Sequence, residues 1–230
     1  MTDVDKFQVR AWFDFIVAST KESSATELGR IFQTDNSTRL WDKYKHAKHV
    51  PSCSNDENQG RGYAFAVAKI LPDTLWLLRH PIWPVMSGKK NSPREFLEML
   101  EGFSGSAQDY YLPFHAMRPM DPFEFLEEII GKEIWIERGD WFGALDHLAA
   151  NLMMMNFGTA QFNRFARAGI AYNISKTLGP LSQSPWFAKF YEEFFDYLEK
   201  KIWTNLFDSF YHESFKDGLG WRKTQKHWLI

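Results

Sequence analysis

The sequence has 230 residues, of which 44% are hydrophobic, and its 27 Lys and Arg residues nearly balance 29 Asp and Glu residues, giving a formal charge of −2. This composition excludes a disordered chain and a uniformly basic nucleic-acid coat, so a charged partner must be met by a local patch. A single cysteine excludes an intrachain disulfide framework and a Cys-rich zinc site. With no secretory signal and no membrane span expected, we predict a cytoplasmic protein.

The first two predicted helices lie within the first 32 residues. Apolar residues recur at helical spacing between Phe7 and Val17, which indicates a helix with one apolar face. The sequence Ser-Ala-Thr-Glu that begins at Ser24 is typical of a capping box, because the serine and the glutamate can each bond a free amide of the first turn. A second helix is therefore predicted over residues 25–32.

A third helix is predicted after a short polar turn. Asn36 or Ser37 is suited to its N-cap position, and Pro51 lies at or just beyond its end. Its apolar residues are Leu40, Trp41 and Tyr44, of which Trp41 and Tyr44 are expected to pack against Leu28 and Phe13.

The middle of the chain is expected to connect two modules. Residues 52–62 form its most polar stretch, and residues 63–71 predict a short apolar helix. Residues 75–84 contain two prolines and are predicted to form an irregular arm. We therefore expect a module over residues 1–55, a connector over 56–91 and a larger helical domain over 92–230.

Residues 92–230 are predicted to be helical. Capping boxes with proline at the first helical position begin at Ser92 and Asp121, and a long aromatic element follows Ser184 and continues to Phe210. Two further helices carry Trp141, Leu145, Leu148, Ala149 and Leu152, and Phe162, Phe165, Ala166 and Ile170. Strand-like alternation is confined to residues 134–136, so the fold class is predicted to be all-α.

The stretch from Ser24 to Ser52 resembles the helix-turn-helix of the Cro/λ-repressor (XRE-like) family. The spacing of Tyr44, Ala47 and Pro51 is similar to that of an aromatic, a small residue and a proline at the end of the family's third helix; Ala47 stands where the family usually has glycine. The resemblance covers about the first 50 residues. It implies a DNA-binding module whose third helix reads the major groove.

The charge of the third helix supports this function independently of the resemblance. Residues 36–50 contain four basic side chains and one acid, a local charge of +3 in a chain of −2. Ser37, Thr38 and Arg39 lie where a reading helix contacts base edges, and Arg39 suits guanine. The remaining basic residues, predicted to meet phosphates, are Lys43, Lys45 and Lys48. The same lysines also fit a merely solvated helical face.

A second basic patch lies near the end of the sequence. Residues 221–228 also carry +3, and Arg222, Lys223 and Lys226 lie between Trp221 and Trp228. Such a segment can stack on bases or contact phosphates, but it is also typical of a tail packed by its tryptophans.

Catalytic motifs are few. The acids Glu127, Glu128, Glu133, Glu137 and Asp140 are a candidate Mg²⁺ site, which a metal-dependent nucleic-acid enzyme would need. His46 and His49 lack a third ligand, Asp146-His147 lacks a nucleophile, residues 60–62 are no phosphate loop, and Cys53 is expected to be a bystander thiol. No catalytic residue, metal or cofactor is therefore predicted.

The sequence thus predicts a non-enzymatic transcriptional regulator that binds double-stranded DNA. A homodimer is expected, because two-fold proteins read paired half-sites. The alternative is an interaction subunit of a larger complex, in which the aromatic C-terminal helices bind a protein partner.

Overall fold

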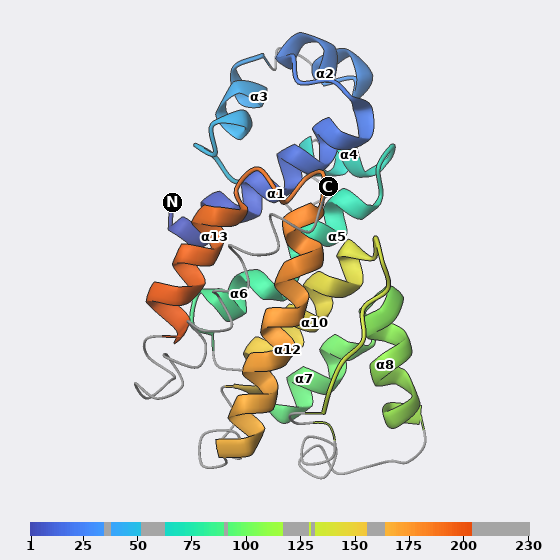
Figure 1. Ribbon diagram of the computed structural model, residues 1–230. Coiled ribbons are helices and arrows are strands. Elements are labelled where there is room, and N and C mark those ends of the chain that lie inside the picture. The colour runs from blue at the N-terminus through green and yellow to red at the C-terminus, as the bar shows by residue number, and fades with distance from the viewer. Residues whose placement is uncertain are drawn as a thin grey trace, which may run out of the picture. The chain divides into compact units, whose positions relative to one another are not determined.

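The computed structural model describes residues 1–34, 38–51, 63–89, 92–116, 129, 132–155 and 164–203 (Figure 1). All regular secondary structure in these ranges is helical, which confirms the all-α prediction. None of the described helices is long and apolar enough to cross a membrane. The α-helices are α1 (Asp3–Thr20), α2 (Ala25–Ile31), α3 (Thr38–Lys45), α4 (Tyr63–Ala68), α5 (Asp73–Arg79), α6 (Ile82–Met86), α7 (Pro93–Leu100), α8 (Gly105–Ala116), α10 (Trp141–Met154), α12 (Arg164–Gln183) and α13 (Tyr191–Tyr197), and a π-helix, η1, spans Leu198–Trp203.

The chain forms two compact units and passes between them three times. The first unit contains Met1–Ser87 and Gln183–Glu192, and the second contains Gly88–Ser182 and Glu193–Ile230. The first unit therefore includes residues 63–87, most of the described part of the segment that was expected to be a connector. A short piece from late in the sequence completes it.

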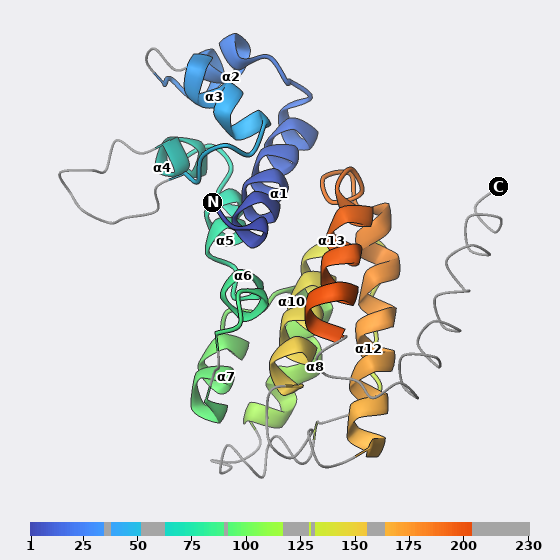
Figure 2. The ribbon, with the colours of Figure 1, turned by 90° about the vertical axis from the view of Figure 1, so that its left-hand side faces the viewer.

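Aromatic side chains fill the core of the first unit. Trp12 of α1 stacks on Trp41 of α3 with ring centroids 5.9 Å apart, and Tyr44 meets Trp12 edge-on at 5.2 Å. Trp41 and Tyr44 lie in one buried cluster with Phe13 and Leu28, as the helical spacing predicted. In both views, α2 and α3 lie side by side at one end of α1 (Figures 1 and 2).

The capping box predicted at Ser24 does not form. Ser24 is the N-cap residue of α2, but its side chain makes no capping hydrogen bond. Glu27, which was expected to bond back to the cap, instead binds Arg30 one turn later, with 2.8 Å between the carboxylate and guanidinium atoms. A competing ion pair thus removes half of the motif. At the start of α1, Thr2 and Asp5 form a reciprocal box that the sequence interpretation missed.

The prediction of an irregular arm over residues 75–84 was wrong, because α5 and α6 cover most of it. Pro72 and Pro81 are the N-cap residues of these two helices, and Pro84 is the third residue of α6. First-turn amides have no partner within a helix, so a proline there costs no hydrogen bond. Proline therefore separates two short helices here without abolishing them.

The second unit contains α7, α8, α10 and α12. The box at Ser92 forms as predicted: Ser92 Oγ accepts from the amide of Glu95 at 3.2 Å, and the Glu95 carboxylate accepts from the amide of Ser92 at 2.7 Å. The predicted helix around Leu145 is α10, and Ile170 lies in α12. The box at Asp121 and residue Phe162 lie outside the described residues.

The aromatic element after Ser184 differs from its prediction. Residues 185–190 form turns, and the helix begins only at Tyr191 before passing into the π-helix. The positions of Leu206 and Phe210 lie outside the described residues. Its described aromatic side chains are mostly buried, including Phe187, Phe190, Phe194 and Phe195.

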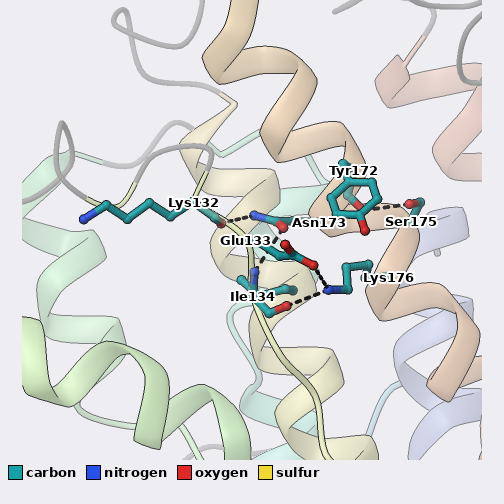
Figure 3. A network of polar contacts seen from close by, with 7 residues as sticks. All are labelled: Lys132, Glu133, Ile134, Tyr172, Asn173, Ser175 and Lys176. Atoms are coloured by element: carbon teal, nitrogen blue, oxygen red, sulfur yellow. Dashed lines mark hydrogen bonds and ion pairs between the residues drawn. The ribbon is translucent and has the colours of Figure 1, made fainter.

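The strand-like residues 134–136 lie in an extended segment without regular secondary structure (Figure 3). The side-chain amide of Asn173 in α12 accepts from the amide of Ile134 at 3.2 Å and donates to the carbonyl of Lys132 at 2.7 Å. Lys176 donates to the Ile134 carbonyl at 2.9 Å and to Glu133 at 2.6 Å. These bonds replace those that a neighbouring strand would supply.

Candidate nucleic-acid interface

The candidate interface is the outer side of α3, whose inner side is fixed in the core. Trp41 and Tyr44 are 1% and 3% exposed, and the indole N–H of Trp41 donates to Thr34 Oγ1 in the turn after α2 at 3.2 Å. Buried side chains three positions apart hold a helix by one face. The rotation of α3 is therefore set, and with it the identity of the side chains that face outward.

The end of α3 is closed by a Schellman motif centred on Ala47. The amide of Lys48 donates to the carbonyl of Lys43 at 2.7 Å, and the amide of Ala47 donates to the carbonyl of Tyr44 at 2.9 Å. Ala47 has φ 46°, in the left-handed region that glycine usually occupies in this motif. Ala47 thus has the left-handed conformation that glycine adopts easily, and glycine is the usual residue at this position in the family that the sequence resembles.

The four basic residues predicted to contact DNA on and after α3 are all exposed. They are Arg39, Lys43, Lys45 and Lys48. Within the described part of the chain, none of the four forms an ion pair or a side-chain hydrogen bond. Their positive charges are therefore not neutralised by carboxylates of the described fold. Cations in this state can release counterions from a nucleic acid when they meet its phosphates.

The outward stripe of α3 consists of Arg39, Asp42 and Lys43, and His46 extends it just beyond the end of the helix. These positions follow the spacing i, i+3, i+4, i+7, which places them on one face, opposite Trp41 and Tyr44, and all four are exposed. The sequence interpretation had counted Asp42 only as a charge and had considered His46 as a further charge or a metal ligand, not as part of this face. The same spacing rule that identified the buried face could have found them.

The remaining predicted contacts fall outside the described residues in whole or in part. Ser37 lies outside them, and Thr38 is the first residue of α3, with its side chain not described. The second basic patch, Arg222, Lys223 and Lys226, also lies outside them.

Two of the acidic residues considered as a metal site, Glu133 and Asp140, have other partners, whereas Glu137 is exposed. Glu133 binds Lys176, and this hydrogen bond lowers the pKa of the Glu133 carboxyl group. Asp140 accepts from the amides of Ser106 and Gly143 at 2.6 and 2.8 Å. Among the residues that the structure describes, no three His, Cys, Asp or Glu side chains are placed to hold a metal ion. Glu127, Glu128, Cys53 and residues 60–62 lie outside that part of the chain.

The three histidines considered as ligands or bases are engaged or buried. His46 Nδ1 lies 2.9 Å from the carbonyl oxygen of Asp42, and the ring of His49 stacks on Tyr44 with centroids 6.0 Å apart. His147 is fully buried in α10 next to Asp146, which accepts from the amide and hydroxyl of Ser104 at 2.8 and 2.9 Å.

No protein-family model matches the chain, and no match was found among curated proteins or solved structures. The helix-turn-helix resemblance therefore depends on the residues of α2, α3 and the turn at Ala47. The geometry of α3 stands beside it as a separate observation.

Proposed function

We propose that this protein binds double-stranded DNA through α3 and acts in the cytoplasm as a transcriptional regulator of the XRE-like kind. The observation that carries the proposal is the group of four exposed cations on and just after α3, which have no ion-pair partner among the described residues. Two of them, Arg39 and Lys43, lie on the face of α3 opposite the buried Trp41 and Tyr44, so the core fixes where their side chains start. Reading bases requires side chains held in a fixed geometry, whereas a helical face that only contacts solvent has no such requirement.

The cations divide into two roles. Arg39 lies in the first turn of α3, where a guanidinium can bind the O6 and N7 atoms of guanine. Lys43, Lys45 and Lys48 are assigned to phosphates. With three phosphate contacts, the logarithm of the binding constant should fall with the logarithm of salt concentration with a slope of roughly −3 per subunit. A homodimer is proposed because a second copy would double these contacts and read a second half-site.

The test is fluorescence polarisation of labelled duplex DNA with the full chain. We expect salt-dependent binding by the wild-type protein, with Lys43→Ala reducing the salt slope by about one and Arg39→Ala weakening binding about tenfold or more. Arg94→Ala is a matched control, because Arg94 lies in α7 of the other unit and already pairs with Glu98 at 3.1 Å.

Two results would contradict the proposal. One is the absence of duplex binding by the wild-type protein at low salt. The other is an equal loss of affinity in Arg39→Ala and Arg94→Ala, which would mean that net charge, and not α3, determines binding.

A second candidate function, an interaction subunit, is supported by two exposed aromatic residues of the second unit. Trp135 and Tyr172 are 45% and 53% exposed, whereas most described aromatic side chains are buried. Exposed aromatic residues are enriched where proteins bind each other. If these two side chains mediate self-association, sedimentation should show a dimer that Trp135→Ser together with Tyr172→Ser converts to monomer.

A further inference from the structure

We propose that Asp42 determines sequence specificity by accepting a hydrogen bond from the exocyclic amino group of cytosine. This inference rests on the proposed function, because it names a base contact for the same face of α3. It starts from an anomaly: the outward stripe of a helix assigned to a polyanion carries a carboxylate at its centre.

The Asp42 carboxylate has cationic neighbours at the spacings that pair on a helix, yet it is not neutralised by them. Arg39 and Lys45 lie three positions away on either side, at a distance where ion pairs commonly form. Within the described residues, neither forms an ion pair with Asp42. The carboxylate is exposed and keeps its capacity to accept hydrogen bonds.

His46, one turn later, is also turned to another partner. Its Nδ1 lies 2.9 Å from the backbone carbonyl oxygen of Asp42. A carbonyl oxygen can only accept, so Nδ1 must carry the hydrogen and donate it. The ring is thereby fixed beside Asp42 by the backbone and leaves the Asp42 carboxylate open.

A carboxylate that approaches DNA is repelled by the phosphates. It binds favourably only if a hydrogen-bond donor on the DNA offsets this repulsion. In the major groove, the donors are the amino groups of cytosine and adenine, and Asp or Glu accepting from cytosine N4 is a recurrent contact. Arg39, one turn earlier on the same stripe, suits guanine. The stripe therefore favours a G·C-rich half-site, and Asp42 disfavours sequences that offer it no amino group.

The experiment selects binding sites from a duplex library with randomised positions, using the full-length wild-type protein and Asp42→Asn. We expect the wild-type protein to select cytosine at one position of its site. Replacing that base pair should weaken wild-type binding about 5- to 100-fold in polarisation titrations. In Asp42→Asn the preference at this position should shift to adenine, because a side-chain amide matches adenine N6 and N7, while the other positions stay unchanged.

Asp73→Asn is the control for net charge, because Asp73 is an exposed aspartate in the first turn of α5 in the same unit. The proposal is overturned if Asp42→Asn selects the same site as the wild-type protein and binds every duplex more tightly by one common factor, since Asp42 would then act only by repulsion. It is also overturned if the wild-type protein binds duplexes without sequence preference, a result that would leave the assignment of α3 as a DNA-binding surface intact. Failure of the wild-type protein to bind any duplex would contradict the proposed function itself.

Discussion

His147 is a titratable side chain in a place that disfavours its charge. Its ring lies 5.6 and 5.4 Å from the rings of Tyr110 and Tyr111, measured between centroids, and it is fully buried. Burial lowers the pKa of His147 to about 4, although Asp140 and the carbonyls of Ser106 and Trp135 act in the opposite direction. His147 is therefore neutral in the folded protein across the neutral and mildly acidic range.

Stability should fall on acidification because of this residue. The pKa of a histidine in the unfolded chain is about 6.5, so between pH 6.5 and 4 the unfolded state binds a proton that the folded state does not. The His147 contribution then lowers the free energy of unfolding progressively as the pH falls, by about 3 kcal/mol in total. Urea unfolding followed by circular dichroism from pH 7 to 4.5 should show this slope, and His147→Gln should flatten it. An unchanged slope in His147→Gln, or equal flattening in the exposed-site control His46→Gln, would contradict this account.

Gly105 is required where Asp140 caps two helices. The Asp140 carboxylate bonds the first-turn amides of both α8 and α10, and a Cβ atom added at Gly105 would collide with that carboxylate. Gly105 also has φ 50°, which disfavours any side chain. Gly105→Ala should lower the free energy of unfolding by about 2 kcal/mol, from backbone strain and a weakened cap.

Gly102 supplies the control for this change. A Cβ atom there would meet only the carbonyl of Met99 at an ordinary contact distance of 3.5 Å. Gly102→Ala should leave the urea midpoint nearly unchanged, and an equal loss in both variants would show that the Asp140 carboxylate is not the cause.

At the scale of elements, all three first helices end on residues other than glycine in the left-handed region. Lys21, Gln33 and Ala47 have φ of 60°, 52° and 46°. Gln33 ends α2 in the same motif in which Ala47 ends α3. The amide of Thr34 donates to the carbonyl of Gly29 at 3.0 Å, and the amide of Gln33 donates to the carbonyl of Arg30 at 3.4 Å. These ends fix the turns between the helices at some cost in backbone strain.

That cost predicts a stabilising substitution. Lys21 is exposed and its amide already donates to the carbonyl of Val17, so glycine can replace it without loss of a contact. Lys21→Gly should raise the free energy of unfolding by about 0.5–1 kcal/mol. Ser19→Gly, at an exposed position inside α1, should lower the free energy of unfolding by a few tenths to 1 kcal/mol. At that position glycine relieves no strain and only increases the conformational entropy of the unfolded chain. Thermal melts of the two variants that shift in the same direction would contradict the strain argument.

The periodic patterns were sufficient to predict most described helices, and the capping box at Ser92 predicted the start of α7, but several other helix ends were not predicted. The spacing of Trp41 and Tyr44 correctly gave the buried side of α3 and hence its exposed cations. The cap at Ser24 failed because Glu27 had a nearer partner in Arg30, a competition that sequence spacing does not resolve. The helices α5 and α6 were missed because the prolines were taken to exclude a continuous helix, whereas they lie at the N-termini of two short helices. Whether Asp42 is paired depends on side-chain geometry and could not be predicted.

At the scale of the whole molecule, the first unit depends on residues that lie between the two segments of the second unit in the sequence. Phe190 packs on Phe7 with ring centroids 6.1 Å apart, Arg10 lies 5.3 Å above the Phe190 ring, and Lys189 pairs with Asp14 at 2.9 Å. All of these partners lie on α1. The helix that supports α3 is thus itself supported by Gln183–Glu192.

Phe190→Ala should therefore destabilise the first unit from a distant point in the sequence. Loss of a buried phenylalanine costs about 3–5 kcal/mol, and Phe190 is 1% exposed. Hydrogen exchange measured by mass spectrometry should show faster exchange in peptides of α1, while Tyr172→Ala, at an exposed position of the second unit, should leave them unchanged. Unaltered exchange in α1 would mean that the returning segment contributes little.

The path of the chain also orders the events of synthesis. Residues 88–182 must leave the ribosome before Trp186 can reach Phe15 and Phe190 can reach Phe7. At about 5–20 residues per second, this delay is roughly 5 to 20 seconds. During that interval α1 emerges without its late partners. Translation that stops early yields a chain that carries α3 but lacks the segment that completes its unit, so premature termination does not release a finished N-terminal unit.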